Sequence, residues 1–163
     1  MNVFEYAMQM EKDGENYYRE LAKKAANPGL KNIFLLLADN EIEHYDIIKA
    51  MKESSDYNFK ETKILGQSKN IFMKIKEQNE DLSGINMSRK EVYEKALDLE
   101  KQSIDFYDDL KNKEIESDIQ KEIISKIKEE EKQHYFLIEN IIEFISNPDT
   151  WLENAEWNHL SEY

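Results

Sequence analysis

The sequence contains no cysteine, only two prolines and four glycines, and no long apolar run. The absence of cysteine excludes disulfides, thiolate nucleophiles, iron–sulfur clusters and cysteine-bound zinc. So few turn formers, beside frequent Glu, Lys, Leu and Ile, argue against a sheet protein and predict an almost entirely helical chain. The longest apolar run, IFLLLA at 33–38, is far too short to cross a bilayer.

Positive charge is also scarce, because 22 basic residues face 35 acidic ones and the net charge is −13. Nucleic acid and anionic membrane surfaces would repel this chain, so we expect neither as a partner. Cations and cationic partners are favoured instead. The first residues, MNVFEYAMQMEKDGE, lack a basic region followed by an apolar stretch, and we therefore expect a soluble cytoplasmic protein.

Apolar periodicity predicts four long helices, at about 2–26, 30–53, 88–112 and 117–146. Asn27-Pro28-Gly29 separates the first two, and Asn147-Pro148 ends the fourth. SRKE at 88–91 and SDIQ at 117–120 have capping-box spacing at the starts of the third and fourth. Tight connections within each pair predict two antiparallel hairpins, at about 2–53 and 88–146.

The segment 54–87 connects the hairpins and holds two glycines, Gly66 and Gly84, with a short helix expected around 68–78. A helix of about 24 residues is roughly 36 Å long, so a connection of this length is what a return along the whole bundle requires. The prediction is an all-α, ferritin-like antiparallel four-helix bundle over 1–146 with one long crossover. A tail at 147–163 follows, with a short helix.

The two hairpins repeat each other. AMQMEKDGENYYREL at 7–21 aligns with ALDLEKQSIDFYDDL at 96–110, and a Glu-x-x-His motif at Glu41 and His44 recurs at Glu131 and His134. About one residue in five is acidic, so a single Glu-x-x-His carries little information, but two at matched positions do. A duplicated hairpin implies a pseudo-twofold axis, and a site on that axis receives the same ligands twice.

Each helix carries a carboxylate at the middle of an otherwise apolar seam. Isolated buried carboxylates cost on the order of several kcal/mol or take up a proton, and no Lys or Arg lies on these seams to pair with them. Two divalent cations would neutralise four carboxylates, with imidazoles completing the coordination. The candidate ligands are Glu11, Glu41, His44, Glu100, Glu131 and His134.

Oxygen-dominated ligands with one histidine per metal favour two iron ions, with manganese as the alternative. Residues i and i+3 share a helix face, so one helix can offer a carboxylate and an imidazole to the same ion. The alternative is a metal-free bundle whose carboxylates are protonated or paired.

Positions relative to the candidate ligands indicate two kinds of residue that could hold those ligands in place. Tyr18 and Tyr107 lie two turns beyond the seam glutamates, where their hydroxyls either reach a ligand carboxylate or belong to an ordinary core. Asn40 and Glu130 directly precede the ligand glutamates of the two motifs and are candidate acceptors for the second ring nitrogen of each histidine.

Small residues occupy a further pair of matched positions, Gly14 and Ser103. A glycine inside a helix costs about 1 kcal/mol relative to alanine. The pair either leaves space beside the metals for a small oxidant, or Gly14 simply permits close helix packing.

The motifs MEKDGENYY, LADNEIEHY, LEKQSIDFY and EEEKQHYF resemble the rubrerythrin branch of the ferritin-like superfamily over about residues 3–146. The resemblance implies that the six candidate ligands bind two irons, with Glu41 and Glu131 as bridges. It also implies reduction of hydrogen peroxide or dioxygen by the diferrous centre.

The sequence departs from that family in two ways. Rubrerythrins proper end in a rubredoxin domain with cysteine-held iron, so for this cysteine-free chain we expect a separate electron-donor protein. They also carry an extra glutamate where this chain has Ser103, a residue that in the family supports ligand exchange with the histidine. Its absence implies a more symmetric site in which His44 stays bound, and gives more weight to an oxidase or ferroxidase.

The leading hypothesis is therefore a di-iron oxidoreductase that reduces peroxide or dioxygen. The alternatives are a ferroxidase or iron-storage protein, and a structural bundle without metal. We expect a homodimer, and a tail helix that presents Trp151 and Trp157 to the bundle or to a second subunit. For His159 in the tail we expect no metal or proton role.

Overall fold

The computed structural model describes residues 2–77 and 90–146, and within these ranges it contains helices and no strands. The long helices are α1 (Val3–Lys24), α2 (Pro28–Lys52), α4 (Lys90–Asp109) and α5 (Asp118–Ser146). A shorter helix, α3 (Ile64–Glu77), lies in the connector, and a π-helical turn, η3 (Leu110–Glu114), ends α4. The all-α, ferritin-like bundle expected from the sequence is confirmed.

Side-chain caps begin three of the helices, and the cap at Ser117 is one that the sequence predicted. The side chain of Asn2 accepts a hydrogen bond from the backbone N–H of Glu5 at the start of α1. Asn27 caps α2 in the same way, with Pro28 in the first turn, and the Ser117 hydroxyl accepts from the backbone N–H of Gln120 at the start of α5. These caps satisfy backbone donors that have no partner within the helix.

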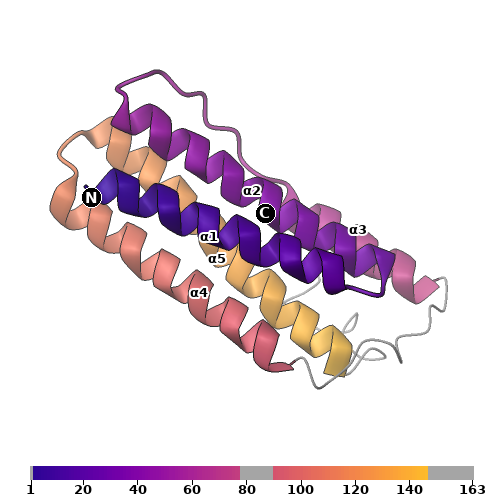
Figure 1. Ribbon diagram of the computed structural model, residues 1–163. Coiled ribbons are helices and arrows are strands. Elements are labelled where there is room, and N and C mark those ends of the chain that lie inside the picture. Colours follow the sequence, from indigo (N-terminus) through magenta and orange to yellow (C-terminus); the bar gives the residue numbers. More distant parts are fainter. Residues whose placement is uncertain (1, 78–89, 147–163) are drawn as a thin grey trace.

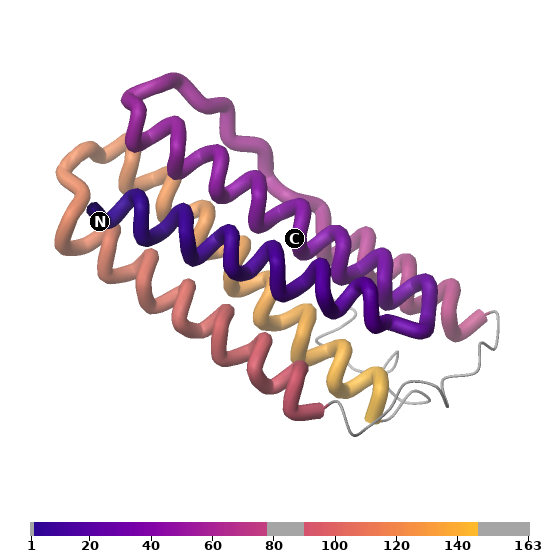
Figure 2. The backbone as a smooth tube through the Cα atoms, viewed as in Figure 1, coloured from indigo at the N-terminus to yellow at the C-terminus, as the bar shows by residue number. Residues whose placement is uncertain are grey.

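The crossover returns along the length of the bundle. α1 and α2 run antiparallel, as do α4 and α5, and α4 begins at the opposite end of the bundle from the end of α2 (Figure 1). The chain after α2 follows the bundle back and continues into α3 (Figure 2). This arrangement makes α1 antiparallel to α4, as the length of the connector predicted.

α3 begins four residues before the predicted short helix at 68–78 and packs on the bundle. Its Phe72 ring lies 4.8 Å from the ring of Phe144 on α5. Ile64 and Leu65 at its start are buried, which draws this part of the connector into the core and extends the helix. A Cβ atom at Gly29 would lie 2.6 Å from Cδ1 of Ile75, so glycine at the start of α2 permits this close approach.

The apolar core is divided into two clusters. One surrounds the α1–α2 connection and includes Leu30, Phe34 and Phe144, while the other lies toward the opposite end and includes Ile48 and Ile124. Between them lies a layer of buried glutamates and histidines. The prediction that each seam is apolar on both sides of a central carboxylate is confirmed.

Within 2–77 and 90–146, no helix has both the length and the apolar character needed for a membrane span.

Candidate metal centre

The two Glu-x-x-His motifs face each other across the middle of the bundle. Glu41 and His44 lie on α2, and Glu131 and His134 lie on α5. All four side chains are at most 3% exposed. Because the glutamate and the histidine of each motif are three residues apart, the helix turns both of them toward the same interior layer.

Six side chains form two overlapping groups of candidate ligands. The first group is Glu11, Glu41, His44 and Glu131, and the second is Glu41, Glu100, Glu131 and His134. Within each group, one ligand atom from every residue lies within 4.8 Å of the others. Glu41 and Glu131 belong to both groups, so they lie where they would bridge two ions. The structure thus brings together all six residues selected from the sequence.

Each histidine lies closest to the glutamate of the opposite motif. His44 Nδ1 lies 2.8 Å from Glu131 Oε1, and His134 Nδ1 lies 2.8 Å from Glu41 Oε1. Within its own motif, His134 Nδ1 is 3.7 Å from Glu131 Oε2. The two hairpins therefore complete each other's half of the cluster.

The carboxylates of α1 and α4 lie at the two ends of the cluster. Glu11 Oε2 is 3.6 Å from His44 Nδ1, and Glu100 Oε1 is 3.3 Å from His134 Nδ1. In the described part of the chain, the ion-pair partners of the four cluster carboxylates are histidines, never Lys or Arg. Among the described residues, the carboxylates of this layer therefore receive no compensating charge from Lys or Arg.

Several oxygens of the cluster have no hydrogen-bond donor. Oε2 of Glu11, of Glu100 and of Glu131 is buried and has no hydrogen-bond partner within the described residues. A buried carboxylate oxygen without a partner is costly, whereas a bound cation would satisfy it. The donor set and its unpaired oxygens fit a metal site.

Burial and mutual repulsion divide the carboxyl groups into two pairs. Burial raises the pKa of Glu41 and of Glu131 well above the ordinary value, and the charges of the other carboxylates raise it further. Burial acts in the same direction on Glu11, but the neighbouring Glu41, His44 and Tyr107 outweigh it and lower its pKa to about 2.

Glu100 corresponds to Glu11. Burial would raise its pKa, yet the charge of His134 and the neighbouring Glu131 and Tyr18 lower it below the ordinary value. Glu11 and Glu100 are therefore ready to bind a cation, while the shared pair, Glu41 and Glu131, holds protons that a cation would displace.

The two predicted tyrosines each contact the opposite hairpin. The Tyr18 hydroxyl donates to Glu100 Oε1 at 2.5 Å, and the Tyr107 hydroxyl donates to Glu11 Oε1 at 2.5 Å. Burial and these carboxylates raise the pKa of both tyrosines well above the ordinary value, so both remain donors. Of the two interpretations left open by the sequence, the structure has the one in which they contact candidate ligands.

The outer ring nitrogens of the histidines also find partners from the opposite hairpin. His134 Nε2 lies 2.6 Å from Asn40 Oδ1, and His44 Nε2 lies 2.9 Å from Glu130 Oε1. Both acceptors directly precede a candidate ligand, as expected. The structure adds a contact that the sequence did not indicate, because the backbone N–H of Thr62 in the connector donates to Glu130 Oε2 at 2.7 Å.

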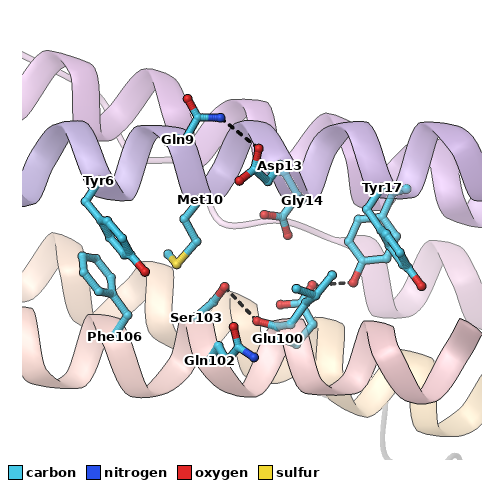
Figure 3. A pocket seen from close by; sticks show the side chains of 13 residues that line it. Tyr6, Gln9, Met10, Asp13, Gly14, Tyr17, Glu100, Gln102, Ser103 and Phe106 are labelled. Carbon is cyan, nitrogen blue, oxygen red and sulfur yellow. Dashed lines mark hydrogen bonds between the residues drawn. The ribbon is translucent and has the colours of Figure 1, made fainter. Parts of the chain in front are cut away.

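A pocket of about 300 Å³ opens between α1 and α4 and reaches Glu41 and Glu100. Figure 3 shows Gly14 and Ser103 on opposite walls of this pocket, with Tyr6 and Phe106 toward one end. A Cβ atom at Gly14 would lie 2.8 Å from Glu41 Oε2, and the Ser103 hydroxyl donates to the backbone oxygen of Leu99. Gly14 thus lines an open space and also permits a close approach by Glu41.

The predicted tail helix, with Trp151, Trp157 and His159, lies outside the described residues.

The pair of aromatic residues at one end of the pocket was not predicted from the sequence. Tyr6 and Phe106 lie off the apolar seams, and a tilted ring contact of 5.1 Å joins them across α1 and α4. Tyr6 precedes the aligned repeat and Phe106 aligns with Tyr17, so the duplication gives no signal that pairs Tyr6 with Phe106.

Comparison with known proteins agrees with this site. The sequence matches the Rubrerythrin family over residues 2–142, a range that contains every candidate ligand. Neither a search of curated proteins nor a search of solved structures finds a significant match. Because the family match covers most of the chain, the protein belongs to the rubrerythrin family.

Proposed function

We propose that this protein is a non-haem di-iron oxidoreductase that reduces hydrogen peroxide or dioxygen, with electrons from a separate donor protein. The observation that carries the proposal is the pair of overlapping ligand groups that share Glu41 and Glu131. Two divalent cations would balance the four carboxylates, and the unpaired oxygens of three of these would gain a partner.

Iron bound here would supply the change of oxidation state that reduction of the oxidant requires. The residues of the chain would hold and shield it. Glu11 and His44 would bind one ion, Glu100 and His134 the other, and the shared glutamates both. Hydrogen bonds from Tyr18 and Tyr107 fix one oxygen of each end carboxylate, and the other oxygen, which has no hydrogen-bond partner, would be available to bind a metal.

The pocket beside Gly14 and Ser103 would admit the oxidant. It is the space along α1 and α4 through which a small molecule reaches Glu41 and Glu100 from solvent. Both shared glutamates are themselves buried, and on the α2 and α5 side the connector is held close to the cluster by the Thr62–Glu130 hydrogen bond.

A ferroxidase or iron-handling protein is the second candidate, and Ser103 favours it. This residue stands where rubrerythrins carry the additional glutamate that supports peroxide chemistry. Storage of iron needs a closed shell of many subunits, so a measurement of mass in solution separates the two functions. A dimer, which we expect, would argue against storage.

Anaerobic titration of the metal-free protein with ferrous iron tests the proposal. We expect saturation near two irons per chain, one for each ligand group. The double variant Glu41→Ala/Glu131→Ala should lose this binding, whereas Glu15→Ala should keep it, because Glu15 is a buried glutamate of α1 that pairs with Lys12 and Arg19 outside the cluster. Stoichiometric iron in the double variant would disprove the assignment.

The loaded protein is then mixed with peroxide or with dioxygen, and near-ultraviolet absorption of the oxidised centre is followed. Faster reoxidation by peroxide would identify a peroxidase, and faster reoxidation by dioxygen an oxidase or ferroxidase. Failure of both oxidants to reoxidise the iron would contradict the proposed activity while leaving the metal site intact.

A further inference from the structure

The inner part of the cluster is nearly symmetric, but the outer hydrogen bonds of the two histidines are not. Positions 40 and 130 correspond in the two repeats, yet one is Asn and the other is Glu. Each accepts from the Nε2 of a histidine on the opposite hairpin. The two imidazoles are therefore held by acceptors of different charge.

His134 is held by a neutral amide. Its Nε2 lies 2.6 Å from Asn40 Oδ1, and the amide nitrogen of Asn40 donates to Glu130 Oε1 and to Glu43 Oε2, each at 3.1 Å. Since the amide group donates at one end, the oxygen that faces His134 is its accepting end.

His44 is held by a carboxylate that faces donors only. Glu130 Oε1 accepts from His44 Nε2 at 2.9 Å and from Asn40 Nδ2 at 3.1 Å, and Glu130 Oε2 accepts from the Thr62 backbone N–H at 2.7 Å. Donors thus reach both oxygens, an arrangement that suits an ionised carboxylate. Glu130 is 3% exposed, so water screens its charge only weakly.

We propose that Glu130 makes the two metal positions unequal, so that a divalent cation fills the position of Glu11 and His44 before that of Glu100 and His134. The proposal rests on the metal centre proposed above. A carboxylate that accepts from the far side of a ligand imidazole makes that imidazole a stronger donor, and its negative charge also attracts the cation. An amide acceptor strengthens the imidazole only weakly as a ligand, and because it is neutral it does not attract the cation.

The connector adds to the difference between the two acceptors. Its Thr62 backbone N–H holds Glu130 in place, while the corresponding neighbour of Asn40 is the exposed side chain of Glu43. Glu43 is also negative, but it lies one hydrogen bond further from a histidine and is in contact with water, which weakens its effect on the cation.

Zinc titration of the metal-free protein, followed by NMR of the histidine rings, tests the order of filling. The chain has only three histidines, so His44→Gln and His134→Gln assign the ring signals. We expect the first equivalent of Zn²⁺ to move the His44 signals and the second to move those of His134. Simultaneous movement of both, or His134 moving first, would overturn the inference.

Isosteric variants then test the cause. Glu130→Gln should weaken the tighter step by about 10–100-fold, the usual effect of losing such an outer partner. Asn40→Asp/Glu130→Gln exchanges the charges and keeps a hydrogen bond between the two positions, so it should reverse the order. Glu43→Gln removes one charge near Asn40 without touching a histidine and should leave the order unchanged.

The results distinguish an error in the role of Glu130 from an error in the proposed metal centre. If zinc does not bind in stoichiometric amounts, the metal centre itself is wrong, and the inference falls with it. If two zinc ions bind and the exchanged variant keeps the wild-type order, the metal centre stands and the role of Glu130 is refuted.

Discussion

The Tyr107 hydroxyl on α4 donates to Glu11 on α1 across a distance of 2.5 Å, and this bond joins the two hairpins at the edge of the charged layer. Tyr18 repeats it in the opposite direction with Glu100. The tyrosine of each hairpin thus orients a candidate ligand of the other. The cluster is therefore complete only when the two hairpins are docked.

Tyr107→Phe should destabilise the metal-free protein by about 1.5–3 kcal/mol, the range for a hydrogen bond to a charged group. The variant leaves Glu11 Oε1 buried without its donor, and the pKa of Glu11 should rise because Tyr107 helps to lower it. Chemical denaturation gives the change in the free energy of unfolding.

Tyr17→Phe is the matched control for this measurement. Tyr17 also lies on α1 and donates across to α4, but to the neutral backbone oxygen of Val92, and it is only partly buried. Its loss should cost about 0.5–1.5 kcal/mol. Equal losses for the two variants would mean that the charge of Glu11 adds nothing to the Tyr107 bond.

Gly14→Ala should lower metal affinity without a large loss of stability. Alanine favours a helix by about 1 kcal/mol over glycine, but its Cβ would lie 2.8 Å from Glu41 Oε2 and displace that carboxylate. Displacing a shared ligand should weaken zinc binding by about tenfold or more, an effect of about 1.4 kcal/mol. Calorimetric titration with Zn²⁺ measures the change.

Gly66→Ala provides the comparison within the same chain. Gly66 lies in α3, where a Cβ atom would meet nothing within 4 Å, so alanine should stabilise the protein by up to about 1 kcal/mol and leave zinc binding unchanged. If Gly14→Ala behaves in the same way as Gly66→Ala, the contact with Glu41 has no role in metal binding.

The metal-free protein should become less stable as pH rises above 4.5, the ordinary pKa of a glutamate. Glu41 and Glu131 have pKa values above the 4.5 of an exposed glutamate, so above that pH the folded state holds protons that the unfolded state has lost. His44 acts in the same direction above 6.5, because Glu11 outweighs burial and raises its pKa. Each such proton lowers the unfolding free energy by about 1.4 kcal/mol per pH unit.

The lowered pKa values of Glu11 and Glu100 act in a different window. Their stabilisation is complete above 4.5 and is lost only as pH falls toward the pKa of about 2 for Glu11. Thermal denaturation across the range should therefore show the decline for the wild type and a flatter curve for Glu41→Gln/Glu131→Gln. Bound zinc should reverse the slope, since its binding releases protons. A flat wild-type profile would show that the shared glutamates hold no protons.

Ser103→Glu should increase the rate of reoxidation by peroxide relative to that by dioxygen. The residue is 8% exposed and lines the pocket beside Glu100, and the new carboxylate would occupy the place of the glutamate that rubrerythrins carry there. A tenfold change in the ratio corresponds to about 1.4 kcal/mol of barrier. Stopped-flow absorption of the iron-loaded variant measures both rates.

Ser103→Gln separates charge from size in this experiment. It has the shape of glutamate without a metal-binding carboxylate, so the ratio should stay near that of the wild type. If glutamine raises the ratio as much as glutamate does, the effect comes from filling the pocket rather than from an added ligand.

The sequence was sufficient for the bundle and for the members of the cluster. Periodic apolar residues located the helices, and carboxylates inside those seams were costly enough to require partners. The duplication then paired Glu41 with Glu131 and His44 with His134. These signals are strong because they depend on the spacing within single helices, which the helix geometry fixes.

Contacts between the hairpins were harder to predict, since the spacing within one helix does not specify which residue lies opposite. Contact with a ligand was one of two alternatives for Tyr18, but the sequence did not identify the ligand as Glu100 of the other hairpin. The predicted start of α3 was four residues too late. Gly66 and the polar residues at 60–63 disfavour a helix, so nothing in the sequence indicated that Ile64 and Leu65 are buried in its first turn.

The hydrogen bond from Thr62 to Glu130 comes from the main chain, and every amino acid except proline could provide it. A substitution at position 62 would therefore keep this bond, whereas an insertion or deletion nearby would move the amide. The Thr62 hydroxyl has a separate role, because it accepts a hydrogen bond from the backbone N–H of Ile64 at the start of α3. Around Thr62, the hydrogen bond to Glu130 therefore restricts the length of the connector more than its composition.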